Sequence, residues 1–289
     1  MDIKHLVVSG AAYNGINIIG ALYQAESANL IDYKNIQSVY GTSAGALALA
    51  IWILRFDKDV VYDYIIGRPW DKTYKFEPNI LLGLIEDKGI LGQNIISEIF
   101  VPLLKSKDIS QNITLGEIYD ITNIEFHVYA TAANGLESLD FSYITHHEVK
   151  LLDCIYMSCS LPLIFKPMYY NDSYIVDGGL TYFFPTKPCI ENGSKKENIL
   201  GIKVCRPGTY NIPKDSNTIE YISFLLNNVT RRLSILVESD IPNIIVCNVP
   251  PLGSELRDTI VKESKRKEML EDGEKAVTQF LQCSVQELA

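Results

Sequence analysis

The sequence Gly-Thr-Ser-Ala-Gly at residues 41–45 most constrains what this chain can fold into. It follows an apolar run typical of a strand, residues 36–40, and precedes an apolar run typical of a helix. A sharp strand-to-helix turn crowds the backbone on both sides of its central residue, and glycine at Gly41 and Gly45 relieves that crowding. Such a turn presents the central hydroxyl at a helix N-terminus, so Ser43 is the candidate nucleophile.

A second strand-to-helix crossing lies at the start of the chain. An apolar run at residues 5–8 is followed by a loop of small residues at 9–15 and then by a helical pattern. In such a loop the backbone N–H groups of Gly10, Ala11 and Ala12 are free to face an anion. This anion is either a phosphate or the oxyanion of an ester intermediate.

Dinucleotide binding is the rival interpretation of this loop. It requires the pattern G-x-G-x-x-G/A and an acidic residue at the end of the second strand. Here Ala12 stands at the central glycine, and the second strand ends in Tyr40. The sequence therefore favours the oxyanion over the nucleotide.

The third motif is Asp-Gly-Gly at residues 177–179. It ends a short β-type run, so the Asp177 carboxylate would project from the end of a strand at a glycine turn. Taken alone, Asp-Gly-Gly is typical of an ordinary turn. Its interest lies in its combination with Ser43.

The histidines distinguish a catalytic triad from a dyad, because a Ser-His-Asp triad needs an imidazole base. His5 and His127 fall in apolar strands, where a structural role is expected, and His146 and His147 lie in a polar stretch and are expected to face solvent. An α/β-hydrolase places its histidine after the acid, and none follows Asp177. A carboxylate that acts directly on the serine fits the chain better.

In order and spacing, the motifs at 9–15, 41–45 and 177–179 resemble those of the patatin-like phospholipase family. The segment 157–167 is also similar to the small-residue, proline-containing segment before that family's aspartate, so the likeness covers roughly residues 4–205. The resemblance implies a three-layer α/β/α fold with a mostly parallel central sheet and a Ser-Asp dyad. It implies the following site residues: catalytic Ser43 and Asp177, oxyanion-binding Gly10, Ala11 and Ala12, and motif-structural Gly15, Gly41, Gly45, Gly178 and Gly179.

The chain departs from the family pattern in the first motif, which is usually G-G-G-x-R/K-G. Ala11, Ala12 and Asn14 occupy three of those positions. Alanine still offers its N–H if the local φ is negative, whereas a positive φ costs on the order of 1 kcal/mol. Loss of the basic residue removes a fixed cation near the loop.

The resemblance implies a lipid acyl hydrolase of phospholipase A or lysophospholipase type that forms an acyl-serine intermediate. Asp177 would accept the Ser43 proton, and the loop N–H groups would hold the oxyanion. We expect neither a metal nor a cofactor, because the sequence lacks H-E-x-x-H, C-x-x-C and D-x-D-x-D-G patterns. The altered loop leaves an alternative open: a catalytically impaired relative that binds a lipid or a protein partner.

The chain has 289 residues, of which 47% are hydrophobic, and alternates strand and helix patterns. We therefore predict one α/β domain over residues 1–289, with the sheet covered on both faces. Strands are predicted near 4–8, 36–40, 124–132, 138–142, 173–176, 197–205 and 243–248. Helices are predicted over 14–27, 44–55, 93–105, 148–159, 216–238 and 256–282, the last packing on the body.

Two regions carry less regular patterns. Residues 67–92 are expected to form a packed excursion over the core, with a cap beside an acyl groove as the alternative; Leu161 to Phe165 would line that groove. A basic cluster at 262–267 is interleaved with acids and is expected to face solvent. The six cysteines show no paired spacing, so we expect free thiols.

Charge and hydropathy limit the partners. A net charge of −9 and a pI near 5.0 argue against nucleic acid and against strong adsorption to anionic membranes. The longest apolar run, residues 46–54, is too short to span a membrane, and the N-terminus does not resemble a secretory signal. We expect a cytoplasmic protein that meets lipid esters at a membrane or micelle surface. The sequence indicates no oligomeric state.

Overall fold

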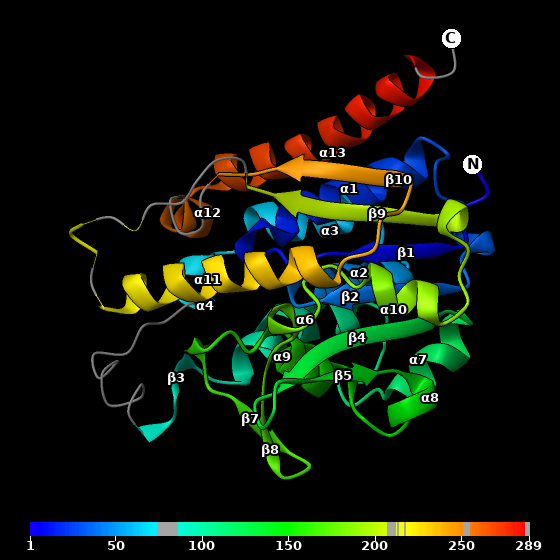
Figure 1. Ribbon diagram of the computed structural model, residues 1–289. Helices are drawn as coiled ribbons and strands as arrows, with labels where there is room; N and C mark the ends of the chain where they lie inside the picture. Colours follow the sequence, from blue (N-terminus) through cyan, green and yellow to red (C-terminus); the bar gives the residue numbers. More distant parts are fainter. Residues whose placement is uncertain (74–85, 207–211, 213, 217, 251–254, 287–289) are drawn as a thin grey trace.

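The computed structural model describes residues 1–73, 86–206, 212, 214–216, 218–250 and 255–286. The main sheet contains β1 (His5–Val8), β2 (Ser38–Thr42), β4 (Glu125–Ala132), β5 (Glu137–Phe141), β7 (Met168–Tyr170), β8 (Ser173–Asp177), β9 (Ile199–Cys205) and β10 (Asn243–Asn248). Their order is β10-β9-β1-β2-β4-β8-β7, with β5 also paired to β4 (Figure 1). The strands from β10 to β4 run parallel, whereas β5, β8 and β7 join through antiparallel pairs.

Helices cover both faces of this sheet (Figure 1). One layer contains α1 (Gly15–Ser27), α2 (Ala44–Ile53), α3 (Lys58–Gly67), α6 (Asn94–Ser106), α9 (Leu151–Cys159) and α13 (Glu263–Gln286). The other contains α10 (Thr186–Glu191) and α11 (Thr218–Val237). Shorter helices are α4 (Trp70–Thr73), α7 (Leu115–Thr122), α8 (Tyr143–His146) and α12 (Leu256–Val261).

Strand periodicity explains why both faces are covered. In β1, Leu6 and Val8 belong to the larger hydrophobic core, whereas Val7 between them belongs to a second core on the opposite face. In β2, Val39 and Tyr40 divide in the same way. Strands that are apolar on both sides need a cover on both sides, which is typical of parallel sheets. The expected three-layer α/β/α class is confirmed.

All seven predicted strands are present, and β2 extends through Gly41 to Thr42. Three strands were not predicted: β7, and the pair β3 (Gly89–Leu91) and β6 (Leu163–Phe165), which form a separate two-stranded parallel sheet. Each is only three residues long, so it carries no readable alternation. The helices α3, α4, α7, α8 and α10 were also not predicted.

The predicted single helix over 256–282 is wrong: α12 and α13 are separated by Lys262, which has an extended backbone. The Arg266 guanidinium donates to the carbonyls of Thr259 and Ile260, which satisfies the end of α12. Arg266 is only 2% exposed, so the expectation that the whole basic cluster faces solvent is also wrong. No glycine or proline marks this break in the sequence.

Helix α13 packs closely on α1. A Cβ on Gly20 of α1 would overlap the Leu270 carbonyl, and one on Gly273 of α13 would overlap the Asn17 carbonyl. Glycine on each helix therefore permits close backbone contact, so that α13 packs directly on α1. None of the described helices is long and apolar enough to cross a membrane.

The region expected to form an excursion or a cap is only partly described. Residues 74–85, which carry most of it, lie outside the described residues. Of the segment expected to line an acyl groove, Leu163–Phe165 forms β6 and pairs with β3. The six cysteines are free thiols in the structure.

Candidate active site

Ser43 follows β2 directly and caps the N-terminus of α2. Its φ of 55° and ψ of −130° are strained for a residue with a side chain, and such strain recurs at functional sites. A Cβ on Gly41 would lie 2.7 Å from the Ala46 Cα. One on Gly45 would lie 2.9 Å from the Val8 Cγ1 and closer still to the Ser9 carbonyl oxygen. The crowding that explains the two glycines is therefore present in the structure.

Strand register brings Asp177 to the same level of the sheet as Ser43. Thr42, the residue before Ser43, pairs with Tyr129 of β4. The next residue of β4, Ala130, pairs with Asp177 at the end of β8. The other edge of β4 pairs with β5, so β2 and β8 meet end to end along one edge of β4, and the turn after β2 lies next to the end of β8.

The side chains of Ser43 and Asp177 interact, and each residue is 7% exposed. Burial raises the pKa of Asp177 to about 6, while hydrogen bonds from the Ser43 hydroxyl and the Gly179 N–H oppose that shift. The Gly179 N–H donates to the Asp177 Oδ1 at 2.7 Å. A carboxyl with a pKa near 6 is ionised at neutral pH and is a stronger base than aspartate in water.

Residues at the end of α9 hold both sides of this pair. The Ser43 N–H donates to the Ser158 Oγ at 2.7 Å, and the Ser158 hydroxyl donates to the Tyr129 carbonyl at 2.6 Å. The Asp177 N–H donates to the Ser160 carbonyl at 2.9 Å. The sequence alone does not distinguish Ser158 from its neighbours, apart from its place in the small-residue segment 157–167.

Cys159 is a further neighbour that the sequence did not reveal. Its thiol hydrogen-bonds with the Ser43 side chain. Burial, and then the charge of Asp177, raise its pKa well above the usual range, so the thiol is neutral. Ser43 therefore lies between an acidic group and a neutral sulfur.

The loop after β1 reaches the same site. A Cβ on Gly10 would lie 3.7 Å from the Ser43 Cβ. The Gly10 N–H already donates to the Phe183 carbonyl at 2.8 Å, whereas those of Ala11 and Ala12 meet no acceptor within the described part of the chain. Ala11 has a φ of −148°, which any residue adopts, but Ala12 has a φ of 52°. The cost considered for alanine in this loop therefore applies to Ala12 alone.

A cation approaches this loop from a distant part of the chain. Arg206, directly after β9, donates from its Nη2 to the Ala11 carbonyl at 3.2 Å. The Ala11 carbonyl and the Ala12 N–H belong to one peptide unit, so this bond orients that N–H and polarises it. Asn14 replaces the loop's basic residue, yet a guanidinium lies beside the loop.

The Phe183 ring lies beside two of the motifs. A Cβ on Gly10 would meet its Cε2 at 3.0 Å, and one on Gly179 would meet its Cδ2 at 3.5 Å. Gly178 is equally confined, because its Cβ would overlap the Tyr129 carbonyl. A Cβ on Gly15 would lie 3.0 Å from the Ala44 Cβ, where the two crossings pack together.

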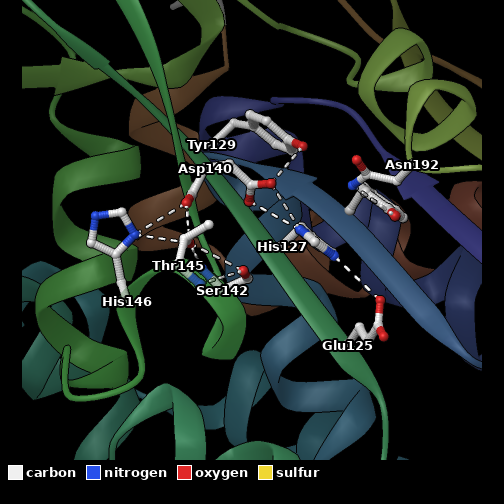
Figure 2. A network of polar contacts seen from close by, with 9 residues as sticks. Glu125, His127, Tyr129, Asp140, Ser142, Thr145, His146 and Asn192 are labelled. Atoms are coloured by element: carbon white, nitrogen blue, oxygen red, sulfur yellow. Dashed lines mark hydrogen bonds and ion pairs between the residues drawn. The ribbon is translucent and has the colours of Figure 1, made fainter.

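None of the four histidines, all of them in described segments, hydrogen-bonds to Ser43 or Asp177. His127 is buried in β4, where its Nδ1 lies 2.9 Å from the Asp140 Oδ2 (Figure 2). The His127 ring also stacks on Tyr40. His127 therefore has the expected structural role. His146 differs from the expectation in part, because its Nδ1 lies 3.2 Å from the Asp140 carbonyl (Figure 2).

Within the described ranges, no group of three or more histidine, cysteine, aspartate or glutamate side chains is placed to hold a metal ion. The groups that surround Ser43 are instead a carboxyl, a thiol and backbone N–H groups. Together they offer a hydroxyl beside a base and free amide donors nearby.

The chain is similar to two viral proteins. It is 23% identical to the "Probable lipid hydrolase 463L" of Invertebrate iridescent virus 6 over 276 residues, which cover 91% of each chain. It is also 23% identical over 184 residues to the "Uncharacterized protein R571" of Acanthamoeba polyphaga mimivirus, covering 64% of this chain and 60% of that one.

Solved structures share the fold. VipD from Legionella pneumophila matches 98% of this chain with a TM-score of 0.58 and 17% identity, over 67% of its own length. ExoU in the ExoU–SpcU complex of Pseudomonas aeruginosa matches 99% with a TM-score of 0.53 and 12% identity, over 52% of its length. The family model described as "Patatin-like phospholipase" matches residues 6–190, which is more than half of the sequence. The chain therefore belongs to the patatin-like phospholipase family.

Proposed function

We propose that the protein is a lipid acyl hydrolase that cleaves carboxylic ester bonds with a Ser43–Asp177 dyad. The observation that carries this proposal is the buried Asp177 carboxyl, hydrogen-bonded with a Ser43 hydroxyl that a strained strand-to-helix turn presents. The family and the name of the iridescent virus relative support a lipid substrate. The sequence motifs and this geometry support the same pair of residues.

In the first half-reaction the Ser43 hydroxyl attacks the ester carbonyl, and Asp177 accepts the hydroxyl proton. The tetrahedral intermediate carries a negative oxygen, which the N–H groups of Ala11 and Ala12 stabilise together with the N-terminus of α2. The intermediate then collapses: the carbon–oxygen bond to the alcohol breaks, and the alcohol leaves with the proton from Asp177. An acyl-Ser43 ester remains.

The second half-reaction uses the same groups. Asp177 accepts a proton from water as that water attacks the acyl carbonyl. Collapse of the second tetrahedral intermediate releases the fatty acid and returns the proton to Ser43. Each proton moves between Asp177 and an oxygen atom, so no metal ion is needed at any step.

Burial makes Asp177 competent for this role. An aspartate in water has a pKa of about 3.9 and accepts protons poorly near neutrality. The environment here raises the pKa of Asp177 to about 6, which improves the proton acceptor while leaving it ionised at pH 7. Ser43 and Asp177 exchange the proton directly, without an imidazole between them.

The alternative is a catalytically impaired relative that binds lipid or a protein. The specific observation that favours it is the oxyanion loop, where the Gly10 N–H is already bonded to Phe183 and Ala12 has a positive φ. A lost oxyanion donor lowers the rate by about 10²- to 10³-fold. This alternative therefore predicts lipid binding with little or no turnover.

Turnover of a fluorogenic short-chain ester and of phosphatidylcholine tests the proposal. We expect Ser43→Ala and Asp177→Asn each to lower kcat on the order of 10⁴-fold or more. Ser27→Ala and Asp63→Asn are matched controls, because both residues are exposed on helices away from the site. Mass spectrometry of wild type mixed with ester should detect the acyl group on Ser43. Equal rates in wild type and both dyad variants would contradict the proposal.

A further inference from the structure

Helix α11 carries an apolar stripe on its solvent side. Its members are spaced by three or four residues and are 38–79% exposed: Tyr221, Leu225, Val229, Leu233 and Leu236. That spacing places them along one face of an α-helix. We call this set the α11 stripe.

The opposite side of α11 packs on the candidate active site. The helix contacts the turn at 178–180 that follows Asp177. The Thr230 Cγ2 lies 3.7 Å from the position of a Cβ on Gly179, and Ser234 is buried. At these two positions small polar side chains face the protein, whereas the larger apolar members of the α11 stripe face outward.

The charge of α11 differs from that of the whole chain. Its 20 residues include one acid, Glu220, and two arginines, Arg231 and Arg232, for a formal net charge of +1. The chain as a whole carries −9. A weakly basic, apolar helix in an acidic protein is a surface that phospholipid headgroups would not repel.

We propose that the α11 stripe is the surface with which the protein docks on a phospholipid layer. This inference rests on the proposed lipid hydrolase function, because such an enzyme must reach esters held in a lipid aggregate. An exposed row of apolar side chains marks an interaction site, and an amphipathic helix can lie in the plane of a lipid interface with its apolar face inserted. Docking through α11 places the lipid surface about one helix diameter, roughly 10 Å, from the turn that holds Asp177. In Figure 1 this helix lies in front of the central sheet.

Vesicle binding tests the stripe without any need for turnover. The Ser43→Ala protein is mixed with phosphatidylcholine vesicles and sedimented, with and without the substitutions Leu225→Glu and Val229→Glu. We expect the two charges to lower the partition constant by about tenfold or more, because each must be desolvated at the interface. The matched control is Ile121→Glu with Ile144→Glu, two side chains that are 62% and 63% exposed on α7 and α8. This control should bind vesicles as the parent does.

Turnover in the Ser43-containing protein provides the second measurement. The α11 variant should lower the ratio of phosphatidylcholine-vesicle turnover to monomeric-ester turnover by about tenfold, and the control variant should leave that ratio unchanged. Equal vesicle binding by parent, α11 variant and control would overturn the proposal. So would light scattering that shows the stripe holding two copies together while vesicle binding stays the same. Because Ser43→Ala reports binding alone, an inactive enzyme would contradict the proposed function but not the docking surface.

Discussion

The Ser158 hydroxyl accepts a hydrogen bond from the Ser43 backbone N–H at 2.7 Å. The same hydroxyl donates a hydrogen bond to the Tyr129 carbonyl at 2.6 Å, so it satisfies a donor at the strained turn and an acceptor in β4. All three groups are buried. Because the ends of β2 and β8 are adjacent along one edge of β4, this contact holds the nucleophile beside the strand end from which Asp177 projects.

Removing that hydroxyl should destabilise the protein. Ser158→Ala leaves the Ser43 N–H without an acceptor inside the protein, and an unsatisfied buried donor costs roughly 1–3 kcal/mol. The measurement is the free energy of unfolding in urea. Ser106→Ala is the control, since its hydroxyl donates only to the Leu103 carbonyl at a partly exposed site. Equal losses in the two variants would contradict a special role for Ser158.

Hydrolysis should depend on the ionisation of Asp177. Only the carboxylate accepts the Ser43 proton, and burial raises the pKa of Asp177 to about 6. We expect kcat/KM for a soluble ester to be half-maximal near pH 6 and to fall about tenfold per pH unit below it. Tryptophan fluorescence at each pH would separate this effect from acid unfolding. A flat profile down to pH 4.5 in folded protein would rule out Asp177 as the base.

Asp177→Asn should make the protein more stable at pH 7. The carboxyl titrates near pH 6 when folded and near pH 3.9 when unfolded, so between these values the native state binds more protons and stability falls as pH rises. Above pH 6 the full cost, roughly 3 kcal/mol, is present. The neutral amide avoids it and still accepts from the Gly179 N–H. Urea unfolding should show that the free energy of unfolding rises by roughly 2–3 kcal/mol at pH 7 and that this gain vanishes near pH 4. No gain at pH 7 would mean that folding does not raise the pKa of Asp177.

Gly45, in the strand-to-helix turn after Ser43, should tolerate no side chain. A Cβ on Gly45 would overlap the Ser9 carbonyl oxygen, so Gly45→Ala should cost about 3 kcal/mol or more in the free energy of unfolding. The control is Gly67→Ala at the end of α3, where a Cβ would meet no atom within 4 Å. That control should be neutral or slightly stabilising, because alanine favours helices. Similar melting temperatures for both variants would show that the turn is looser than described.

Arg206 should affect the rate more than substrate binding. It donates to the Ala11 carbonyl and thereby positions the Ala12 N–H. Arg206→Ala should lower kcat about tenfold with little change in KM, because the oxyanion exists only during reaction. Arg206→Lys keeps the charge, and added guanidinium should partly restore the alanine variant. A rise in KM with an unchanged kcat would instead assign Arg206 to substrate binding.

Local patterns predicted most of the sheet. The apolar runs at 5–8 and 124–132 and the Gly-x-Ser-x-Gly turn each depend on neighbours in sequence, so β1, β4 and the turn at Ser43 were predictable. The three-residue strands β3, β6 and β7 carry no such pattern. The break at Lys262 depends on Arg266 reaching back to α12, and no turn residue announces it.

By itself the sequence determined most strands of the main sheet, the strand-to-helix turn at Ser43, the strand-end carboxyl at Asp177 and the family they indicate. Tertiary structure alone decided that Ser43 and Asp177 meet, because β2 and β8 pair with consecutive residues on the same edge of β4 and so end next to each other. Ser158 is 115 residues from Ser43, and Arg206 is 195 from Ala11. Hydrophobic periodicity acts over a few residues, whereas burial and hydrogen bonding depend on what packs nearby in space.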